Sequence, residues 1–288
     1  MKIGIVGSIN IDVMYKVDRK PKQGETLVGN SYEINNGGKG ANQAVILNSL
    51  EDDVVFLGAV GNDVFGCEAK TNFVNKSMLS KVLTKKGNTG LAIIKVSNKD
   101  NEIIVFKGAN DKITKDDIDE FLDNNLELEI IVLQLEINLE SIKYLIFRAF
   151  DLGIKVILNP APAIRLDKEI ISKVTYLIPN EIEAETIFKT KDLEQIILDN
   201  QGKVIITIGK QGVMYFDGNV PKIMPTEKIE VVDTTGAGDS FVAGFTSGIA
   251  QGLSLEGAIS KGISVASITC QYFGAQTAYK EIRKEWKK

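Results

Sequence analysis

The chain has 288 residues, of which 44% are hydrophobic and 25% charged, enough for one large α/β core. A formal net charge of −4 and a sequence pI of about 5.2 argue against a general nucleic-acid binder. Histidine is absent, which excludes every catalytic or metal site that requires imidazole and leaves Asp, Glu or, less readily, Lys as a general base.

The N-terminal apolar run Ile3–Val6 is too short for a signal peptide, and no apolar stretch approaches the roughly 18 residues of a membrane span. We therefore expect a cytoplasmic protein with neither a membrane nor a nucleic-acid partner. The two cysteines, Cys67 and Cys270, lie far apart in the sequence. They are expected to be buried small apolar residues rather than disulfide partners or zinc ligands.

Five short apolar runs, rich in β-branched residues, indicate strands that are covered on both faces, as in a parallel sheet. They are Ile3–Val6, Ile130–Leu133, Val156–Leu158, Leu177–Ile178 and Val204–Ile206. Helical patterns such as Leu139–Asp151 and Glu181–Phe188 lie between them. This alternation predicts a single α/β domain over residues 1–288, with a doubly wound, mostly parallel sheet and helices on both faces.

Polar side chains follow each of the five runs. They include Asn10 and Asp12 after the first run, Glu136 after the second, and then Asn159, Asn180 and Thr207. In open α/β sheets, ligands bind at the carboxyl edge of the strands. One polar residue there would usually be a cap or a turn, but five together predict a binding site.

Two regions predict antiparallel strands that stand off the main sheet. Val13–Val17 and Leu27–Tyr32 flank a Pro/Gly turn, whereas Leu91–Val96 and Glu102–Phe106 flank the polar connection Ser97–Asn101. Edge decoration is one interpretation. A small antiparallel β lid, built from about residues 13–33 and 90–106, is the favoured one, because the first region begins directly after two candidate ligand residues.

The segment Gly61–Gly66 has glycines at Walker-like spacing, but Cys67 and Glu68 stand where a P-loop requires Lys and Ser or Thr. We expect a turn that leads into a helix, with Asp63 as its N-cap. No G-x-G-x-x-G follows the first strand, so a dinucleotide-binding Rossmann domain is unsupported.

The segment Asn35-Asn36-Gly37-Gly38-Lys39-Gly40-Ala41-Asn42-Gln43-Ala44 places glycines at a predicted helix start. Glycines allow the backbone to approach a ligand closely, Lys39 adds a mobile cation, and Asn42 lies one turn along the helix. A glycine-rich turn that only caps a helix explains the segment nearly as well.

The segment Asp233-Thr234-Thr235-Gly236-Ala237-Gly238-Asp239-Ser240-Phe241 is the most informative one. Three small residues precede Asp239 at the start of an apolar helix, so free amides and a carboxylate meet at the positive end of a helix dipole. This end attracts phosphate and favours an ionised Asp239, which could take a proton from a hydroxyl that attacks the phosphate. The segment predicts phosphoryl transfer to an alcohol.

A structural interpretation of the same segment is an Asp cap with glycines for tight packing. Ser240, Gly244 and Gly248 recur every four residues, which would let the helix lie close to the sheet. This spacing does not explain the three small residues before Asp239, so the functional interpretation is favoured.

These segments, together with Gly7–Asp12, Leu133–Glu136, Leu158–Ala163 and Pro179–Glu185, resemble the PfkB carbohydrate kinase family over essentially the whole chain. The G-G-K-G-A-N-Q-A form at Gly37–Ala44 looks most like the members that phosphorylate ribose. The resemblance implies a ribokinase-like fold and transfer of the γ-phosphoryl group of ATP to the 5-hydroxyl of D-ribose. A kinase for 2-deoxyribose, another sugar or a nucleoside stays open, as does a non-catalytic sugar- or nucleotide-binding protein.

The resemblance also implies roles for the matching residues. The base would be Asp239, beside an anion hole formed by Gly236, Ala237 and Gly238. The sugar would be bound by Asn10, Asp12, Gly38, Lys39, Asn42, Glu136 and Asp239. The nucleotide would be bound by Asn180, Glu183, Thr207, Ile208, Gly209, Lys210, Gln211, Gly212, Gly238 and Ile263, with Asn180 and Glu183 also tied to Mg²⁺ or another divalent cation through water.

The resemblance further implies K⁺ as an activator and a homodimer formed through the lid. The cation would be bound by Asp233, Thr235, Thr269, Tyr272, Gly274 and Ala278, mostly through backbone carbonyls. Two departures from relatives lie in this set: Ala278 stands where Ser is frequent, and Tyr272-Phe273 replaces a basic pair.

Overall fold

The computed structural model describes residues 1–76, 78, 80–97 and 100–286. The strands are β1 (Lys2–Val6), β2 (Asn10–Lys16), β3 (Ser31–Gly37), β4 (Val54–Gly61), β5 (Ser80–Lys85), β6 (Gly90–Ser97), β7 (Asp100–Phe106), β8 (Leu128–Leu133), β9 (Lys155–Leu158), β10 (Tyr176–Leu177), β11 (Ile206–Thr207), β12 (Val213–Phe216) and β13 (Pro221–Met224). The helices are α1 (Lys39–Ser49), α2 (Val64–Asn75), α3 (Lys115–Asp123), α4 (Leu139–Asp151), α5 (Lys168–Lys173), α6 (Glu181–Phe188), α7 (Leu193–Asp199), α8 (Ala237–Ala250), α9 (Leu255–Thr269) and α10 (Tyr279–Trp286). The predicted helices Leu139–Asp151 and Glu181–Phe188 are confirmed.

A six-stranded sheet in the order β10-β9-β8-β1-β4-β5 forms the centre of the molecule, and all of its pairs are parallel. Four of the five predicted strands lie in it. The fifth, Val204–Ile206, differs, because β11 belongs to a separate antiparallel sheet with β12 and β13. Isolated parallel bridges from Leu177 to Val204 and from Asn180 to Thr207 still join this sheet to the edge of the central one.

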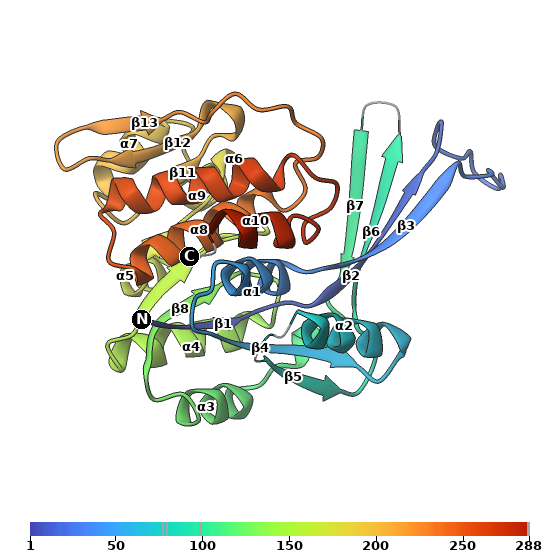
Figure 1. Cartoon of the computed structure of the whole chain (residues 1–288), viewed down its shortest axis with the longest axis horizontal. Helices are drawn as coiled ribbons and strands as arrows, with labels where there is room; N and C mark the ends of the chain where they lie inside the picture. Colours follow the sequence, from blue (N-terminus) through green and yellow to red (C-terminus); the bar gives the residue numbers. More distant parts are fainter. Residues whose placement is uncertain (77, 79, 98–99, 287–288) are drawn as a thin grey trace.

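Helices cover both faces of the central sheet (Figure 1), which confirms the predicted doubly wound α/β class. One core packs α1, α2, α8, α9 and α10 against one face through residues such as Ile3, Ile5 and Phe245. The other packs α3 to α7 against the opposite face through residues such as Leu57, Ile131 and Leu133. Each such side chain contributes roughly 1.5–3 kcal/mol through burial.

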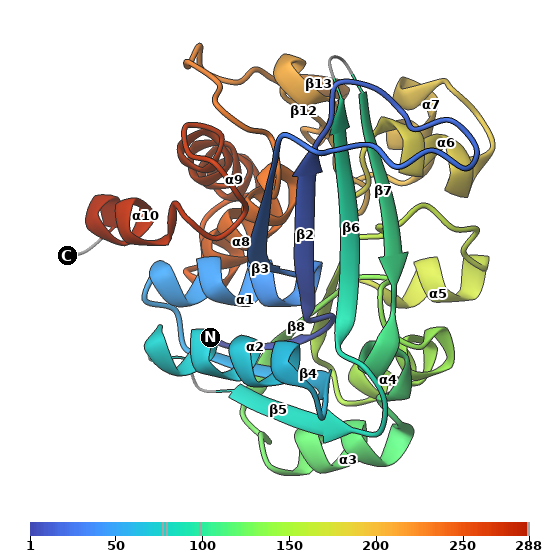
Figure 2. The same ribbon diagram turned by 90° about the vertical axis from the view of Figure 1, so that its right-hand side faces the viewer.

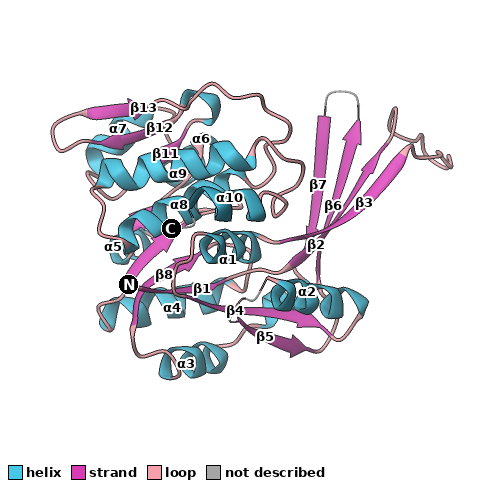
Figure 3. Cartoon of the chain, viewed as in Figure 1, coloured by secondary structure: helices cyan, strands magenta, loops and turns pink. Residues whose placement is uncertain are grey.

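A second sheet, which we call the lid sheet, has the order β3-β2-β6-β7 and projects from the body (Figures 2 and 3). It differs in two respects from the predicted antiparallel strands. β2 and β6 pair in parallel, because both leave the body side by side from Asn10 and Gly90. The strand expected at Leu27–Tyr32 lies at Ser31–Gly37 instead, since the hairpin register pairs Lys16 with Ser31.

Residues 98–99 of the predicted connection Ser97–Asn101 lie outside the described residues. The flanking strands β6 and β7 pair in antiparallel fashion as expected, from Leu91 opposite Phe106 to Ser97 opposite Asp100. The candidate ligand residues Asn10 and Asp12 belong to β2 itself, so the lid sheet begins inside the candidate site.

Three local predictions can be compared with the structure. Asp63 caps α2 as expected and accepts a hydrogen bond from the Gly66 amide at 2.8 Å. The expected burial of Cys67 is wrong, because this residue lies on the exposed side of α2, whose buried face is formed by Gly66, Ala69 and Phe73. Cys270 is only partly buried.

The regularly spaced small residues of α8 allow close packing against α9, not against the sheet as expected. An added Cβ at Gly244 would lie 2.9 Å from the Cα of Gly262, and one at Gly248 would lie 2.7 Å from the Cα of Ala258. These glycines therefore admit α9 rather than the sheet. In the described part of the chain, no helix is long and apolar enough to cross a membrane.

Candidate active site

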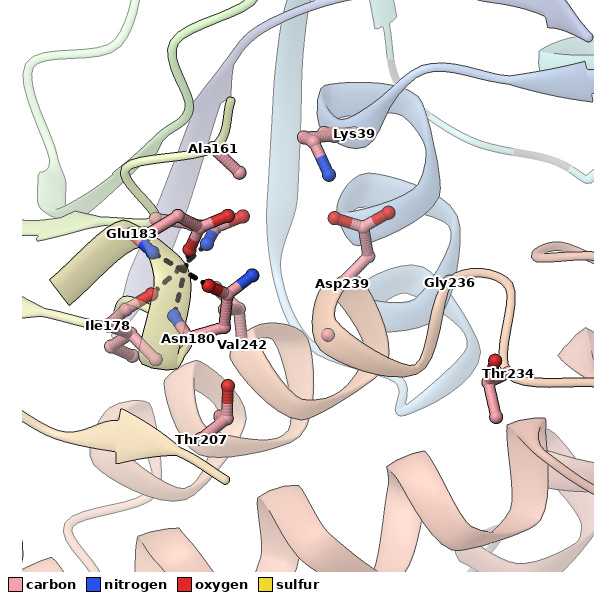
Figure 4. Close-up of a pocket in the computed structure, with 12 residues that line it drawn as sticks. Lys39, Ala161, Ile178, Asn180, Glu183, Thr207, Thr234, Gly236, Asp239 and Val242 are labelled. Carbon is pink, nitrogen blue, oxygen red and sulfur yellow. Dashed lines mark hydrogen bonds between the residues drawn. The ribbon is translucent and has the colours of Figure 1, made fainter. Parts of the chain in front are cut away.

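A pocket of about 240 Å³ opens at the carboxyl edge of the central sheet (Figure 4). It is lined by Lys39, Asn159, Ala161, Ile178, Asn180, Glu183, Thr207, Thr234, Gly236, Gly238, Asp239 and Val242. Three segments that the sequence singled out independently thus meet in one cavity. They are the start of α1, the start of α6 and the start of α8.

The start of α8 leaves backbone donors free beside this pocket. Gly236 is the N-cap with φ 78°, and an added Cβ would lie 2.6 Å from that of Ala275, so only glycine fits there. The amide of Ala237 donates to the carbonyl of Thr234 at 3.1 Å. Among the described residues, no group accepts a hydrogen bond from the amides of Gly236, Gly238 and Asp239. An added Cβ at Gly238 would meet nothing within 4 Å, so the space over this helix start is open to an anion.

Asp239 is buried at 6% exposure and is held from α1 by two adjacent side chains. Asn42 donates its Nδ2 to Asp239 Oδ2 at 2.9 Å, and Gln43 donates its Nε2 to Asp239 Oδ1 at 3.2 Å. Each carboxylate oxygen keeps a further lone pair for an incoming hydroxyl proton. Gln43 was given no role by the sequence, although it lies within the glycine-rich segment.

The start of α1 rests directly on the end of β1. Gly38 is the N-cap with φ 89°, and an added Cβ would lie 2.6 Å from the backbone nitrogen of Asn10. A Cβ on Gly40 would lie 2.6 Å from the Cα of Gly7, so both glycines are required by close backbone contact. This contact directs Lys39 towards Asp239 (Figure 4).

The ammonium of Lys39 faces several carboxylates. The pKa of Lys39 is raised, mainly by the charge of Asp239 and further by Glu136, Glu183 and Asp12, against the opposing effect of burial. Lys39 therefore stays charged, and it can neutralise an anion in the pocket.

A second group of polar residues lies where the lid sheet meets the body. Glu136 accepts hydrogen bonds from Ser8 Oγ at 2.5 Å and from the Lys39 amide at 3.3 Å. Asn10 accepts from Asn110 Nδ2 at 2.8 Å, and Asn110 also bonds to both backbone groups of Ile9. The sequence did not indicate a role for Asn110, because this residue lies in a 3₁₀ turn with no recognisable motif.

The carboxyl group of Asp12 belongs to the same group of residues. Its pKa is raised from 3.8 to about 7, mainly by burial and further by the charges of Glu136 and Asp239, while Lys39 lowers it. Burial therefore makes the ionised group costly, and it would gain from hydrogen-bond donors such as sugar hydroxyls.

The start of α6 provides a buried carboxylate on the opposite wall of the pocket. Asn180 and Glu183 form a reciprocal capping box, in which Asn180 Oδ1 accepts from the Glu183 amide at 2.9 Å and Glu183 Oε2 accepts from the Asn180 amide at 2.8 Å. Burial raises the pKa of Glu183. The capping role explains the spacing of the two residues, and both still line the pocket.

Four of the residues that were expected to bind the nucleotide line the pocket: Asn180, Glu183, Thr207 and Gly238. The others lie outside it: Ile208, Gly209, Lys210, Gln211, Gly212 and Ile263. Gly209–Gln211 forms a 3₁₀ turn directly after β11, at the same sheet edge as Thr207.

The expected cation residues form a junction between two loops outside the pocket. Asp233 Oδ1 accepts from the amide and the hydroxyl of Thr235 at 3.0 and 2.8 Å, and Asp233 Oδ2 accepts from the Gly274 amide at 2.9 Å. Thr269 bonds to Ser240 of α8 through their hydroxyls at 2.7 Å. Tyr272 and Ala278 complete the loop, with Ala278 fully buried.

Among the residues that the structure describes, no three His, Cys, Asp or Glu side chains are grouped to hold a metal ion. A cation bound here would therefore need hydroxyl, backbone carbonyl, water or ligand oxygens besides the carboxylate of Glu183 or Asp233. Apolar lining residues such as Ala161, Ile178 and Val242 were not predicted, because nothing in their type or spacing distinguishes them from the core.

Known proteins are similar to this chain over nearly its whole length. The model of the pfkB family carbohydrate kinases matches residues 2–282. A ribokinase from Lactococcus lactis is 36% identical over 277 residues, which cover 96% of this chain and 92% of that protein. A deoxyribokinase from Salmonella typhi is 33% identical over 297 residues, which cover 98% of this chain and 96% of that protein. The structure of an Arabidopsis thaliana ribokinase with ribose and ATP superposes with a TM-score of 0.84 at 27% identity, covering 100% of this chain and 99% of that one.

Proposed function

Because the chain belongs to the pfkB family of carbohydrate kinases, we propose that it transfers the γ-phosphoryl group of ATP to the 5-hydroxyl of D-ribose, giving ribose 5-phosphate. Family membership makes the chain a kinase that transfers phosphate to a sugar. The observation that carries the proposal is the buried Asp239 carboxylate at a helix start with unpaired amides, opposite the Lys39 ammonium.

In the proposed reaction, the helix start and Lys39 hold the phosphate that is transferred. Of the expected anion-hole residues, Gly236 and Gly238 have free amides and would donate to the phosphate together with the Asp239 amide, whereas the Ala237 amide is bonded to Thr234. Lys39 would neutralise part of the negative charge that develops there. Positioning and charge stabilisation supply most of the rate in such reactions. Asp239 accepts the hydroxyl proton as attack proceeds, so a strong base is not required in the ground state.

We assign the sugar to the polar group at the base of the lid sheet. Asp12 would accept two hydrogen bonds from sugar hydroxyls, Glu136 would accept another, and the Asn10 amide could accept or donate one. Gly38, Lys39 and Asn42 would complete the sugar pocket on the α1 side, near the phosphate that is transferred. This placement is supported by the electrostatic coupling of Asp12 to both Glu136 and Asp239.

The raised pKa of Asp12 predicts a pH-dependent affinity for the sugar. In the free enzyme, this carboxyl group is protonated below about pH 7 and ionised above it. Because sugar hydroxyls donate to the ionised form, the KM for the sugar should be about tenfold higher at pH 6 than at pH 8, with the KM for ATP little changed. Steady-state kinetics between pH 5.5 and 8.5 test this, and a sugar KM that is flat or falls towards low pH would contradict it.

We assign Mg²⁺ or another divalent cation to the Asn180–Glu183 wall of the pocket. Mg²⁺ prefers oxygen ligands and keeps several waters, so one buried carboxylate beside bound phosphates suits it. Glu183 would hold the hydrated ion, and Asn180 would bind phosphate or water. When bound, the ion would neutralise phosphate charge. Thr207, Ile208 and the turn Gly209–Gly212 would hold the nucleotide, with Ile263 as one wall of the adenine pocket.

Activation by K⁺ is assigned to the junction between the Asp233 and Gly274 loops. This junction offers oxygen donors from Asp233, Thr235 and the carbonyls of Thr269, Tyr272, Gly274 and Ala278. The hydrogen bond from the Gly274 amide to Asp233 supports the proposal, because it brings both loops to one place. A monovalent cation there would stabilise the start of α8.

We propose a single catalytic domain whose lid sheet mediates a homodimer. Strand register places Val13, Ile34, Ile93 and Ile104 in one row across the outer face of the lid sheet, the face opposite Asp12. Ile34 and Ile104 are 51% and 59% exposed, so this face can bury apolar surface against a second copy. ATP as donor also supports a cytoplasmic location.

A substrate panel tests the proposed function. ADP release should be measured with ATP and, in turn, D-ribose, 2-deoxy-D-ribose, D-fructose and a purine nucleoside. We expect the highest kcat/KM with D-ribose. A higher value with 2-deoxyribose, which the deoxyribokinase relative makes the second candidate, would correct the substrate. Tight ribose binding without turnover would instead indicate a non-catalytic binding protein.

A further inference from the structure

Four side chains form a continuous hydrogen-bonded chain that ends on Asp239. Lys76 Nζ donates to Asn72 Oδ1, and Asn72 Nδ2 donates to Gln276 Oε1 at 2.9 Å. Gln276 Nε2 donates to Asn42 Oδ1 at 2.9 Å, and Asn42 Nδ2 donates to Asp239 Oδ2 at 2.9 Å. We call this arrangement the amide relay; it links the end of α2, the loop before α10, α1 and α8.

The chemistry of the two ends gives the amide relay one direction. An ammonium only donates hydrogen bonds, and an ionised carboxylate only accepts them. The three amides between them can satisfy both ends in one way alone, with every NH₂ group turned towards Asp239. Reversing any single amide would place two oxygens or two NH₂ groups face to face.

The inner part of the amide relay is shielded from water. Asn42 is 6% exposed, Gln276 is 9% exposed, and Asp239 is 6% exposed. Inside a protein, water cannot readily replace a lost hydrogen-bond partner. Reversing one amide would therefore leave the next side chain of the amide relay without a matching donor or acceptor. Both polar ends of the Asn42 side chain are engaged, one by Asp239 and the other by Gln276.

From this geometry, and on the basis of the proposed function, we propose that Gln276 and Asn72 are positioning residues that fix the orientation of the Asn42 amide and so present an N–H donor to Asp239. Neither residue lines the pocket. They act through Asn42 by keeping the Asp239 carboxylate oriented and free of a facing amide oxygen.

The sharpest test is Asn72→Asp, with Asn72→Leu as the matched control. The new carboxylate keeps an acceptor for Lys76 but presents an oxygen to Gln276, which favours reversal of Gln276 and then of Asn42. The Asn42 oxygen would face Asp239 and disfavour its ionised form. Leucine has a similar size and removes the contact without reversing it. A charge control is Thr71→Asp, which adds the same charge on an exposed neighbouring position of α2.

We expect Asn72→Asp to lower kcat about tenfold with both KM values within about twofold, and to move the acidic limb of the kcat–pH profile up by about one pH unit. Asn72→Leu should lower kcat less than Asn72→Asp does and leave the acidic limb unchanged, whereas Thr71→Asp should stay within about twofold of the wild-type kcat. The charged groups that face Asp239 from its other neighbours are Lys39 on α1, Asp12 on β2 and Glu183 on α6, and all are unchanged in these variants. At the far end of the amide relay, the Lys76 ammonium lies over the ring of Tyr279. The Tyr279 hydroxyl accepts a hydrogen bond from Arg283.

A double-mutant cycle separates positioning from a general loss of stability. In an Asn42→Ala background, the amide relay is already cut, so Asn72→Asp should have no further effect on kcat or on the pH profile. Gln276→Leu should lower kcat with the acidic limb unchanged, because it removes the donor to Asn42 without adding an oxygen. Thermal unfolding of every variant checks that the fold is retained.

Equal kcat values and equal pH profiles for Asn72→Asp and Asn72→Leu would overturn the inference. So would an effect of Asn72→Asp that persists in the Asn42→Ala background. These outcomes are distinct from failure of the proposed function, because that failure would appear as absent ribose-dependent ADP release in the wild-type enzyme.

Discussion

Replacing Asp239 by asparagine should lower kcat with D-ribose and ATP by roughly 10²–10⁴ and leave the fold intact. The carboxylate lies at the start of α8 beside unpaired amides and opposite Lys39, where a hydroxyl that attacks a bound phosphate would lose its proton. An amide of the same size keeps the volume but cannot accept that proton. Both KM values should change far less than kcat, because the loss is confined to the transition state.

The substitution also changes the contacts to Asn42 and Gln43, so a structural control is required. Asp192→Asn is a matched one, since Asp192 caps α7 on the surface through the Gln195 amide and lies outside the pocket. It should retain full activity. Thermal unfolding and ribose binding by calorimetry would show whether Asp239→Asn is folded and still binds the sugar. A folded Asp239→Asn variant with near-normal kcat would remove Asp239 from the role of base.

Asp12→Ala should raise the KM for ribose by roughly 10- to 150-fold, with a much smaller change in the KM for ATP. The range follows from loss of about 1.5–3 kcal/mol for hydrogen bonds to a charged group. Asp12 lies at the base of the lid sheet, and its carboxyl group is coupled to Glu136 and Asp239. The KM values come from steady-state kinetics with each substrate varied at saturation of the other.

Glu33→Ala is the matched control for this variant, because Glu33 is an exposed acid on the adjacent strand β3 of the same sheet. It should leave both KM values near those of wild type. If Asp12→Ala raised the two KM values equally, the residue would not be a sugar contact, and the sugar would have to be placed elsewhere in the site.

The central strands were predictable because strands buried on both faces have continuous apolar sequences. Ile3–Val6 and Ile130–Leu133 are continuous apolar runs, as strands covered on both faces must be. β4 and β5 were not predicted. β4 contains glycines at positions 58 and 61, which resemble a turn, and β5 is an edge strand of mixed polarity.

The helix starts of the site were predictable for a similar local reason. Glycines at 38 and 236 are required by positive φ and close backbone contact, and they mark the starts of α1 and α8 in the sequence. The partners of Asp239 were not predictable as a set. Asn42 and Gln276 are 234 residues apart, and nothing local indicates that their amides meet.

The register of the lid sheet also depends on distant contacts. The parallel pairing of β2 with β6 is determined by where both strands leave the body, which the alternation within each strand does not encode. Local patterns therefore identified the elements that carry the chemistry, whereas the side chains that orient them became visible only in the three-dimensional structure.

The identity of the product tests most directly whether the protein phosphorylates the 5-hydroxyl of D-ribose. The wild-type protein should be incubated with D-ribose, ATP and Mg²⁺, and the mixture followed by ³¹P NMR with proton coupling. We expect a ribose-dependent phosphate monoester on the 5-oxygen, coupled to the two protons at carbon 5 and formed together with ADP. Phosphate on another ribose oxygen, or no sugar phosphate from a folded protein that binds ribose, would contradict it.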